Sequence, residues 1–460
     1  MLQKISDRFL KYFLLIIFVF FSIASLLATQ SCDADGAEEI SYIPIYKLHD
    51  NILFHLIALV MLAALWLLLF RLEGTIRKIW HKYGRVIQFA VAVIIGVLAY
   101  LIHHDGVRAP YGDQAQVYGA AMYFNSDFYV QLSPGGYLDM YPQQLGYIFI
   151  IQQLFRITGS SSFGLIQTLN CILVGALSFG ICLFADSLTD EALPQIFCTL
   201  FLFLCLPLYL FPKLVYGDIP ALTFSAYFLY HITMILKGGH KRHFILCAVD
   251  ICLAVLLKKN TLILVIAAVI ILLIKIISEK KYKYLLISRI ITALPLCAIN
   301  AVEGYYERQS GYEISGGIPA LAWIAMGTIE QDCPGWFNNY GAPLYNENHC
   351  DPEATSAEAL KKLKERMSYF VEDPIYGISF WKRKICTQWN DPFYHSDELL
   401  FLDDGETPVG ITAFLLTHKS AVLIILSLTQ NIIYLGMVFY LLFRHSERKL
   451  YLLLPELYIL

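Results

Sequence analysis

Long apolar runs constrain the fold of this chain more than any other feature. A helix that crosses the hydrocarbon core of a bilayer needs about 20 predominantly apolar residues. Runs of about that length recur along almost the whole chain, at 12–28, 51–70, 86–102, 163–185, 193–211, 219–236, 244–257, 261–277, 285–301 and 419–443. With a C-terminal segment added, the pattern predicts an all-α polytopic membrane protein with about eleven transmembrane helices.

The composition excludes a soluble globule. Hydrophobic residues make up 57% of the 460 positions and charged residues 15%, against about 45–50% and about 25% in an average soluble chain. The formal net charge is -3, whereas a nucleic-acid binder needs a basic face that neutralises phosphates. We therefore expect the lipid bilayer as a partner, and no nucleic acid.

Basic residues in the short loops predict the orientation, because Lys and Arg are retained on the cytoplasmic side. They cluster at 4–11, 71–85, 237–242, 280–283 and 444–449. This pattern predicts a multi-pass protein with a cytoplasmic N-terminus. The first apolar run is interpreted as an anchor, and not as a cleaved signal peptide, because a second full-length run follows it.

One apolar stretch is too short to cross the membrane. Leu145 to Phe155 has about a dozen residues and carries Gln152 and Gln153, so we expect an interfacial or re-entrant helix on the outer face. Residues 103–162 then form one large extracytoplasmic loop. The same parity places residues 302–411 outside, and their 18 Asp and Glu against 8 Lys and Arg suit that side.

We expect four parts: a transmembrane hairpin at 1–85, a transmembrane core at 86–301, an extracytoplasmic region at 302–411, and a C-terminal transmembrane part at 412–460. The last apolar run stops after about half a span, which leaves open whether the chain is truncated there. Within 302–411, the spacing of Thr355 and Glu358 predicts a capping box at a helix start. A disulfide between Cys333 and Cys350 is one option that the sequence leaves open.

An acidic residue stands at the start of a helix-like run after the third span. Pro110 and Gly112 precede this residue, Asp113. A carboxylate at a helix N-terminus is stabilised as an anion by free backbone N–H groups and by the helix dipole, as a general base or a cation ligand requires. The alternative is that Asp113 only caps a helix that begins at Gln114.

A second acidic residue, Asp218, follows the span that ends near Leu210 and faces the same side by parity. Pro220 in the next turn also fits a purely structural N-cap. On that side Lys258 and Lys259 interrupt two apolar runs. Charge so close to hydrocarbon is costly, so such residues usually have a partner or a role, and snorkelling of both lysines at a tight turn is an equal alternative.

These motifs resemble a known family. Pro110-Tyr111-Gly112-Asp113-Gln114-Ala115-Gln116-Val117-Tyr118-Gly119-Ala120-Ala121 is similar to the first-loop motif of the GT-C superfamily of membrane glycosyltransferases, nearest to protein O-mannosyltransferases and bacterial aminoarabinose transferases. Tyr141-Pro142-Gln143-Gln144 looks like the juxtamembrane segment that follows, and Val215-Tyr216-Gly217-Asp218 like the second acidic loop. The resemblance spans about 86–301. The usual Asp-Glu pair is Asp113-Gln114 here, which puts metal dependence in question.

The resemblance implies transfer of a sugar from a polyprenyl-phosphate donor to a glycan, lipid or protein acceptor, with inversion, at the outer face of a bacterial plasma membrane. Asp113 would be the catalytic base and Asp218 the second acidic residue. The residues that would contact substrate are Gln114, Tyr118, Tyr141, Lys258 and Lys259. A divalent cation is an option that the sequence does not require.

Two alternatives remain at this point. A transporter or lipid flippase would have a similar number of spans, but it would typically show internal repeats and charged or broken helices near the bilayer midplane. Neither is visible in the sequence. A polymerase or ligase of surface polysaccharide would use the same kind of lipid-phosphate donor and carry a whole glycan.

Overall fold

The structure is a computed structural model that describes residues 2–27, 29–32, 45–48, 52–104, 110–330, 338–394, 396, 399, 409–443 and 449–459. In these residues the regular structure is helical except for two four-residue strands, β1 (Thr29–Cys32) and β2 (Ile45–Leu48). The strands pair antiparallel, with Thr29 opposite Leu48. Cys333 lies outside the described residues, and so does the disulfide with Cys350 that the sequence leaves open.

Eight described helices are long and apolar enough to cross a membrane. They are α1 (Leu2–Leu27), α2 (Ile52–Arg71), α3 (Glu73–His104), α7 (Phe163–Leu188), α10 (Asp218–Leu236), α12 (Leu262–Glu279), α13 (Lys283–Ser310) and α20 (Lys419–Phe443). A ninth crossing results if α8 (Ala192–Leu204) forms one span with α9 (Leu206–Leu210) and η3 (Phe211–Lys213), across a bend of 50°. The chain is a multi-pass helical membrane protein.

The described helices that meet the length of a span are fewer than the eleven we expected. The predicted span at 244–257 is α11 (Arg242–Leu257), which has 16 residues, fewer than the usual 20 or so. It packs against α10 and α13. The C-terminal apolar run forms η5 (Leu450–Leu452) and the seven-residue α21 (Leu453–Ile459), which packs against α12.

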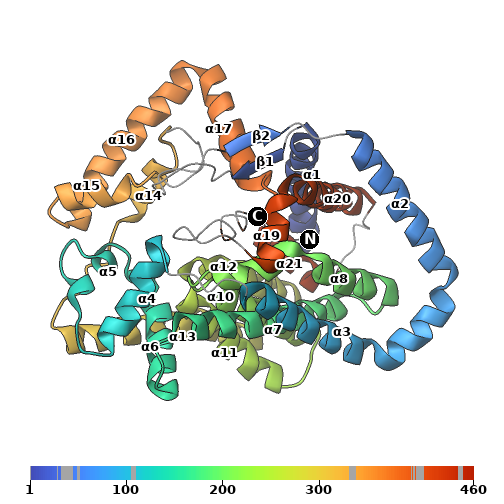
Figure 1. Ribbon diagram of the computed structural model, residues 1–460, viewed down its shortest axis with the longest axis horizontal. Helices are drawn as coiled ribbons and strands as arrows, with labels where there is room; N and C mark the ends of the chain where they lie inside the picture. The colour runs from blue at the N-terminus through green and yellow to red at the C-terminus, as the bar shows by residue number, and fades with distance from the viewer. Residues whose placement is uncertain are drawn as a thin grey trace.

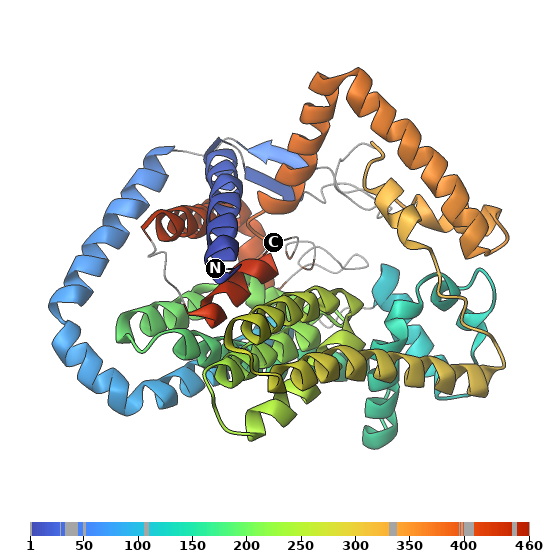
Figure 2. The ribbon, with the colours of Figure 1, turned by 180° about the vertical axis from the view of Figure 1, so that it is seen from behind.

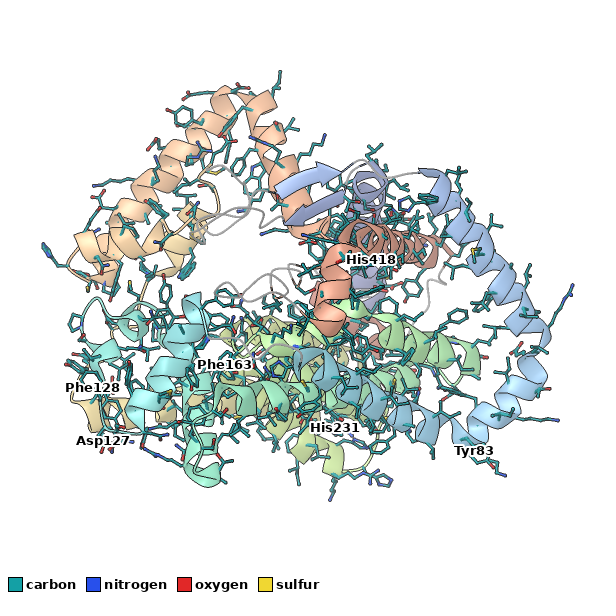
Figure 3. All side chains as sticks on the ribbon, in the orientation of Figure 1. Tyr83, Asp127, Phe128, Phe163, His231 and His418 are labelled. Atoms are coloured by element: carbon teal, nitrogen blue, oxygen red, sulfur yellow. The ribbon has the colours of Figure 1, made fainter. Side chains whose placement is uncertain are left out.

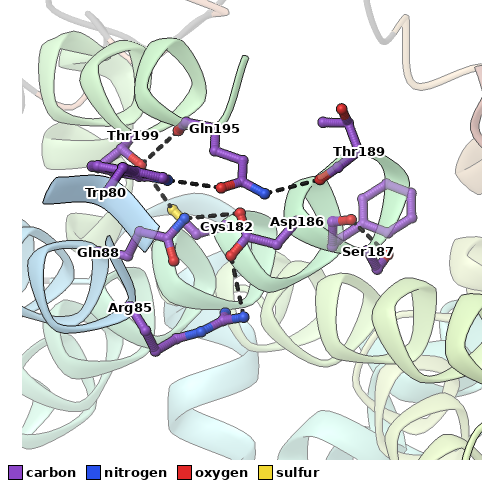
Figure 4. Close-up of polar contacts among 10 residues, drawn as sticks. Trp80, Arg85, Gln88, Cys182, Asp186, Ser187, Thr189, Gln195 and Thr199 are labelled. Carbon is purple, nitrogen blue, oxygen red and sulfur yellow. Dashed lines mark hydrogen bonds and ion pairs between the residues drawn. The ribbon is translucent and has the colours of Figure 1, made fainter. Parts of the chain in front are cut away.

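The basic segment between the second and third predicted spans is helical and not a loop. α3 begins at Glu73, directly after α2, so its first turns carry these basic residues. Arg85 Nη2 of α3 lies 3.2 Å from Asp186 Oδ2 of α7. Trp80 Nε1 donates to Gln195 Oε1 of α8 at 2.7 Å (Figure 4). These contacts hold one end of α3, α7 and α8 together.

Apolar side chains between the long helices form the core of the bundle. α7 packs against α3 and α10, and α12 packs against α13, while α1 packs against α20 beside this bundle. Phe228, Ile251 and Ile271 belong to one fully buried cluster between these helices. Three short helices, α4 (Gly112–Phe124), α5 (Tyr137–Met140) and α6 (Leu145–Thr158), lie at one end of the bundle, which we call the Asp113 end (Figure 1).

The short apolar helix α6 has 14 residues and is not among the candidate spans. It points across the end of the bundle, whereas α13 runs along it (Figure 2). The fully buried Gln152 explains this placement, because its Nε2 donates to Phe124 O of α4 at 2.9 Å and its Oε1 accepts from Tyr306 Oη of α13 at 2.9 Å. Gln152, which makes this segment unsuitable as a membrane span, thus holds α6 in place through two hydrogen bonds.

Both expected boundaries of the 302–411 region fall inside helices, because α13 continues to Ser310 and α19 runs over Gly410–Thr417. Between them lie α14 (Ala320–Met326), α15 (Gly341–Glu347), α16 (Pro352–Glu372) and α17 (Pro374–Trp389). α16 and α17 meet at an apex that projects away from the bundle (Figure 1). The predicted capping box at Thr355 is wrong. The helix starts earlier, because Asp351 Oδ1 accepts from the backbone N of Glu353 at 2.8 Å and of Ala354 at 3.2 Å, which makes Asp351 the N-cap.

Candidate functional site

Asp113 is an exposed residue in the first turn of α4, and it does not cap that helix. The N-cap position is Tyr111, and no side chain makes a capping hydrogen bond there. Instead, Tyr216 Oη donates to Asp113 Oδ2 at 3.1 Å. The structural alternative for Asp113 is therefore wrong, and its carboxylate is bonded to a distant loop.

Tyr216 has a complete set of polar contacts. Gln144 Nε2 of η2 (Pro142–Gln144) lies 2.6 Å from Tyr216 Oη, and Tyr137 Oη lies 3.3 Å from it. A phenol has one proton to donate and two lone pairs that accept. The proton goes to Asp113 and the lone pairs accept from Gln144 and Tyr137, so the network fixes the direction of the Tyr216 hydroxyl.

The acid–base properties of the two tyrosines preserve this arrangement. Burial raises the pKa of Tyr216, and the neighbouring Tyr137 and the Asp113 carboxylate raise it further. Burial also raises the pKa of Tyr137, with a further contribution from Asp113. Both hydroxyls therefore stay protonated at neutral pH, and Tyr216 keeps the proton that it donates to Asp113.

Asp218 joins the same site through a lysine. Lys258 Nζ lies 2.9 Å from Asp218 Oδ1 and 3.0 Å from Oδ2, and 4.6 Å from the centroid of the Tyr216 ring. An ammonium over an aromatic face is attracted by the ring quadrupole. We call the set of Asp113, Tyr137, Gln144, Tyr216, Asp218 and Lys258 the two-aspartate cluster.

The turn between Tyr216 and Asp218 requires a glycine. Gly217 is the N-cap of α10 with φ 79°, a left-handed conformation that costs glycine little. A Cβ at this position would lie 2.5 Å from the carbonyl oxygen of Leu257. Because Gly217 holds the N-cap position, the interpretation of Asp218 as an N-cap is also wrong, and Asp218 is the first residue of the helix.

Gln114 and Tyr118 connect α4 to neighbouring segments of the protein beside the site. The buried Gln114 Oε1 accepts from the backbone N of Val215 at 2.8 Å, which ties α4 to the loop of Tyr216. Tyr118 Oη donates to Ser161 O at 2.7 Å, and its ring meets the ring of Phe163 edge-on, with 5.2 Å between the centroids. The described contacts of both residues are therefore to the protein's own scaffold.

Tyr141 lies where the 302–411 region meets the site. Its ring centroid is 5.0 Å from that of Tyr137 and 6.0 Å from that of Trp323 in α14. Burial raises the pKa of Tyr141, and the Asp113 carboxylate raises it further. Tyr141 thus stands between the two-aspartate cluster and α14.

Polar bonds hold the two regions together beside the site. Ile318 N donates to Met140 O at 3.0 Å. The buried Asp139 accepts from Ser315 Oγ at 2.9 Å, and this hydroxyl lies 2.8 Å from Tyr345 Oη of α15. The 302–411 region is therefore docked on α5 next to the two-aspartate cluster.

The two lysines have different surroundings. Lys258 pairs with Asp218 inside the cluster, whereas Lys259 is exposed and lines a narrow groove with Gly146 and Glu303. Lys258 ends α11 in an extended conformation, φ -151° and ψ 106°, in which consecutive side chains point to opposite sides. Only Lys258 is thus part of the two-aspartate cluster.

Among the described residues, no group of three or more His, Cys, Asp and Glu side chains could hold a metal ion. At Asp218 the neutralising charge is the ammonium of Lys258.

Sequence reasoning missed the centre of the site. Tyr216 and Gln144 stand within two of the motifs named above, but the motifs assign no role to either residue, and Tyr137 lies outside them. The position of these residues in the sequence could have identified them. Tyr216 stands two residues before Asp218 in a tight turn, and Gln144 stands three residues after Tyr141.

The comparisons with known proteins add no relative. No protein-family model, characterised protein or solved structure matches this chain. The fold and the site together define a multi-pass helical membrane protein with a two-aspartate polar cluster at one end of its bundle.

Proposed function

We propose that this protein transfers a sugar from a polyprenyl-phosphate donor to an acceptor at the outer face of a bacterial plasma membrane, with inversion. The observation that supports this proposal is the bond from Tyr216 to the exposed Asp113 carboxylate, next to the Lys258–Asp218 ion pair. It combines an anionic proton acceptor with a cation at the end of a membrane bundle. The orientation with a cytoplasmic N-terminus belongs to the proposal.

Asp113 is the proposed base. An acceptor hydroxyl loses its proton to the Asp113 carboxylate while its oxygen forms a bond to the anomeric carbon. The bond between that carbon and the phosphate oxygen breaks on the opposite face, and polyprenyl phosphate leaves with the electron pair. A positioned base of this kind contributes roughly 10²–10⁴-fold to the rate.

The rest of the cluster positions the reacting groups. Tyr216 orients Asp113, and Asp218 holds Lys258 near the site, where the ammonium can approach the donor phosphate. Lys259 adds positive charge at the entrance of the groove beside it. Tyr141 is placed to contact the sugar or the acceptor, which is a glycan, a lipid or a protein.

Release of polyprenyl phosphate tests the proposal. Purified protein is incubated with a panel of polyprenyl-phosphate monosaccharides and with extracted envelope acceptors, and free polyprenyl phosphate is measured by mass spectrometry. We expect release from one donor class that depends on acceptor. Folded protein that releases polyprenyl phosphate from no donor would contradict the proposal. The same assay with a lipid-linked oligosaccharide identifies a polymerase or ligase.

A second candidate, a transporter or flippase, is favoured by one buried group. His231, labelled in Figure 3, lies on α10. Its Nδ1 is 2.8 Å from His243 Nδ1 of α11, and its Nε2 is 3.7 Å from Asp250 Oδ2. All three residues are buried, and ionisable residues inside membrane bundles often serve transport. Asp250→Asn separates the candidates: it should abolish transport, but it should leave polyprenyl phosphate release intact if the protein is a glycosyltransferase.

A further inference from the structure

A groove of about 520 Å³ lies between α6 and α13 at the Asp113 end of the bundle. Its apolar wall includes Phe149, Ala298 and Val302, and its polar rim includes Arg156, Tyr305 and Arg308. An apolar wall with a cationic rim is the combination that an anionic lipid needs, with chains on the wall and a headgroup at the rim.

The charges of the rim are not neutralised by the protein. Arg156 Nε donates to Asn125 Oδ1 at 3.2 Å and Arg156 Nη1 to Tyr305 Oη at 3.4 Å, and both partners are neutral. Within the described part of the chain, neither Arg156 nor Arg308 forms an ion pair with a carboxylate. Two guanidinium groups therefore offer a double positive charge and several free donors.

The groove borders a second, narrow groove, which is lined in part by Lys259 and Glu303. The two grooves share Leu256 and Val302, and the narrow one also borders Gln143 of η2. The next residue, Gln144, bonds to Tyr216 in the two-aspartate cluster. The helix α6 lines the larger groove from Phe149 to Arg156, and its 14 residues span about 20 Å at about 1.5 Å per residue. The rim at Arg156 and the two-aspartate cluster thus lie toward opposite ends of α6.

The proposed reaction changes the charge of its lipid. The donor is a phosphodiester with one negative charge, whereas the lipid phosphate that leaves is a monoester with about -1.5 to -2 at pH 7. Guanidinium groups bind such phosphates through paired charge-assisted hydrogen bonds. We propose that the groove binds the released lipid phosphate monoester, with Arg156 and Arg308 on the phosphate and the prenyl chain on the apolar wall. This proposal rests on the proposed function.

Binding of farnesyl phosphate, a short prenyl monoester, tests the proposal without turnover. The full-length protein in detergent is titrated at pH 7.5 by calorimetry, alone and as the double variant Arg156→Gln/Arg308→Gln. We expect at least tenfold weaker binding in the double variant. Lys361→Gln/Lys364→Gln removes two charges from exposed positions of α16 and should leave binding unchanged.

Two further ligands decide the chemical class. Farnesyl methyl phosphate, a diester, should bind more weakly than the monoester, and the double variant should remove this preference. Phosphatidylglycerol that binds as well as the monoester would make the groove an ordinary phospholipid site and would overturn the proposal. So would equal monoester affinity in the double variant and the parent protein. Thermal unfolding confirms that each variant is folded. Arg156→Lys keeps a positive charge, so it should lose less of the monoester affinity than Arg156→Gln does.

The two proposals fail separately. If release of polyprenyl phosphate is absent while monoester binding depends on both arginines, the glycosyltransferase proposal falls and the monoester site stands. If release of polyprenyl phosphate is present while monoester binding is indifferent to both arginines, the groove proposal falls alone.

Discussion

Tyr216 donates a hydrogen bond to Asp113 across 103 positions of the chain. This bond joins the start of α4 to the turn before α10, and it places the first acidic residue beside the ion pair of the second. The tyrosine therefore connects two carboxylates that are otherwise on separate segments. Most of the expected effects of substitution follow from this contact.

Asp113→Asn should abolish a base and leave the fold intact. Asparagine cannot accept a proton as a carboxylate does, so transfer should fall by about 10²–10⁴-fold. The melting temperature should hardly change, because Asp113 makes no capping bond and asparagine can still accept from Tyr216. Release of polyprenyl phosphate and thermal unfolding measure the two effects.

Asp127→Asn is the matched control for that substitution. Asp127 has φ 55°, which asparagine tolerates, and it lies outside the two-aspartate cluster. Its activity should be close to that of the parent protein. Normal transfer by Asp113→Asn would remove the catalytic assignment.

Tyr216→Phe should reduce the rate through the position of Asp113. The substitution keeps the ring under Lys258 but removes the donor to Asp113 and the acceptor for Gln144. Loss of a buried hydrogen-bond partner costs about 1–3 kcal/mol, and each 1.4 kcal/mol in a barrier is about tenfold in rate. Turnover should fall about 10- to 100-fold, measured at saturating donor.

Tyr137→Phe serves for comparison, because it removes only the more distant hydroxyl, at 3.3 Å. It should have a smaller effect on turnover than Tyr216→Phe. Equal turnover in both variants would mean that the hydroxyl of Tyr216 does not orient the carboxylate.

Asp218 and Lys258 should act as a pair. Both side chains are partly buried, 33% and 24% exposed, so removal of one partner leaves a charge that is poorly solvated. Lys258→Met should lower the melting temperature in the parent protein, and lower it less when Asp218→Asn is already present. A double-mutant cycle measures this coupling, and additive effects would show that the ion pair is unimportant.

Gly317→Ala should separate the 302–411 region from the site. Gly317 has φ 75°, and a Cβ there would clash with the ring of Pro142 and the carbonyl oxygen of Met140. We expect faster proteolysis near this position and a loss of transfer. Gly316→Ala is the matched control, because it has the same backbone strain at φ 85° but no neighbour within 4 Å of its Cβ. The control should proteolyse more slowly than Gly317→Ala.

The proposed orientation predicts labelling from opposite sides. In a background depleted of the native cysteines, Lys361→Cys in α16 should react with an impermeant thiol reagent in intact cells. Lys241→Cys, before α11, should react only after the membrane is permeabilised. Both positions are exposed, so access to the residue itself does not limit the reaction. Reaction of Lys241→Cys in intact cells would overturn the proposed sidedness.

The sequence alone determined the class of protein and most of the long helices. A run of apolar residues is a local property, and its length against the bilayer needs no knowledge of tertiary contacts. The predicted helix ends are less accurate, because two local signals compete at the start of α16. Asp351 caps the helix and Pro352 begins it, so the cap lies four residues before the predicted one at Thr355. The short α11 was assigned as a span on hydropathy, without regard to its 16-residue length.

Only the tertiary structure decided what each candidate residue contacts. Asp113 and Asp218 were found by their positions at helix starts, but their shared site depends on Tyr216 and Lys258, which packing brings from other segments. Lys258 and Lys259 are adjacent residues of the same type. The extended backbone at the end of α11 directs their side chains to opposite sides. Gln114 is fixed by a backbone N–H that only folding supplies. Contacts between distant segments come from the packing of whole helices, and no local pattern encodes them.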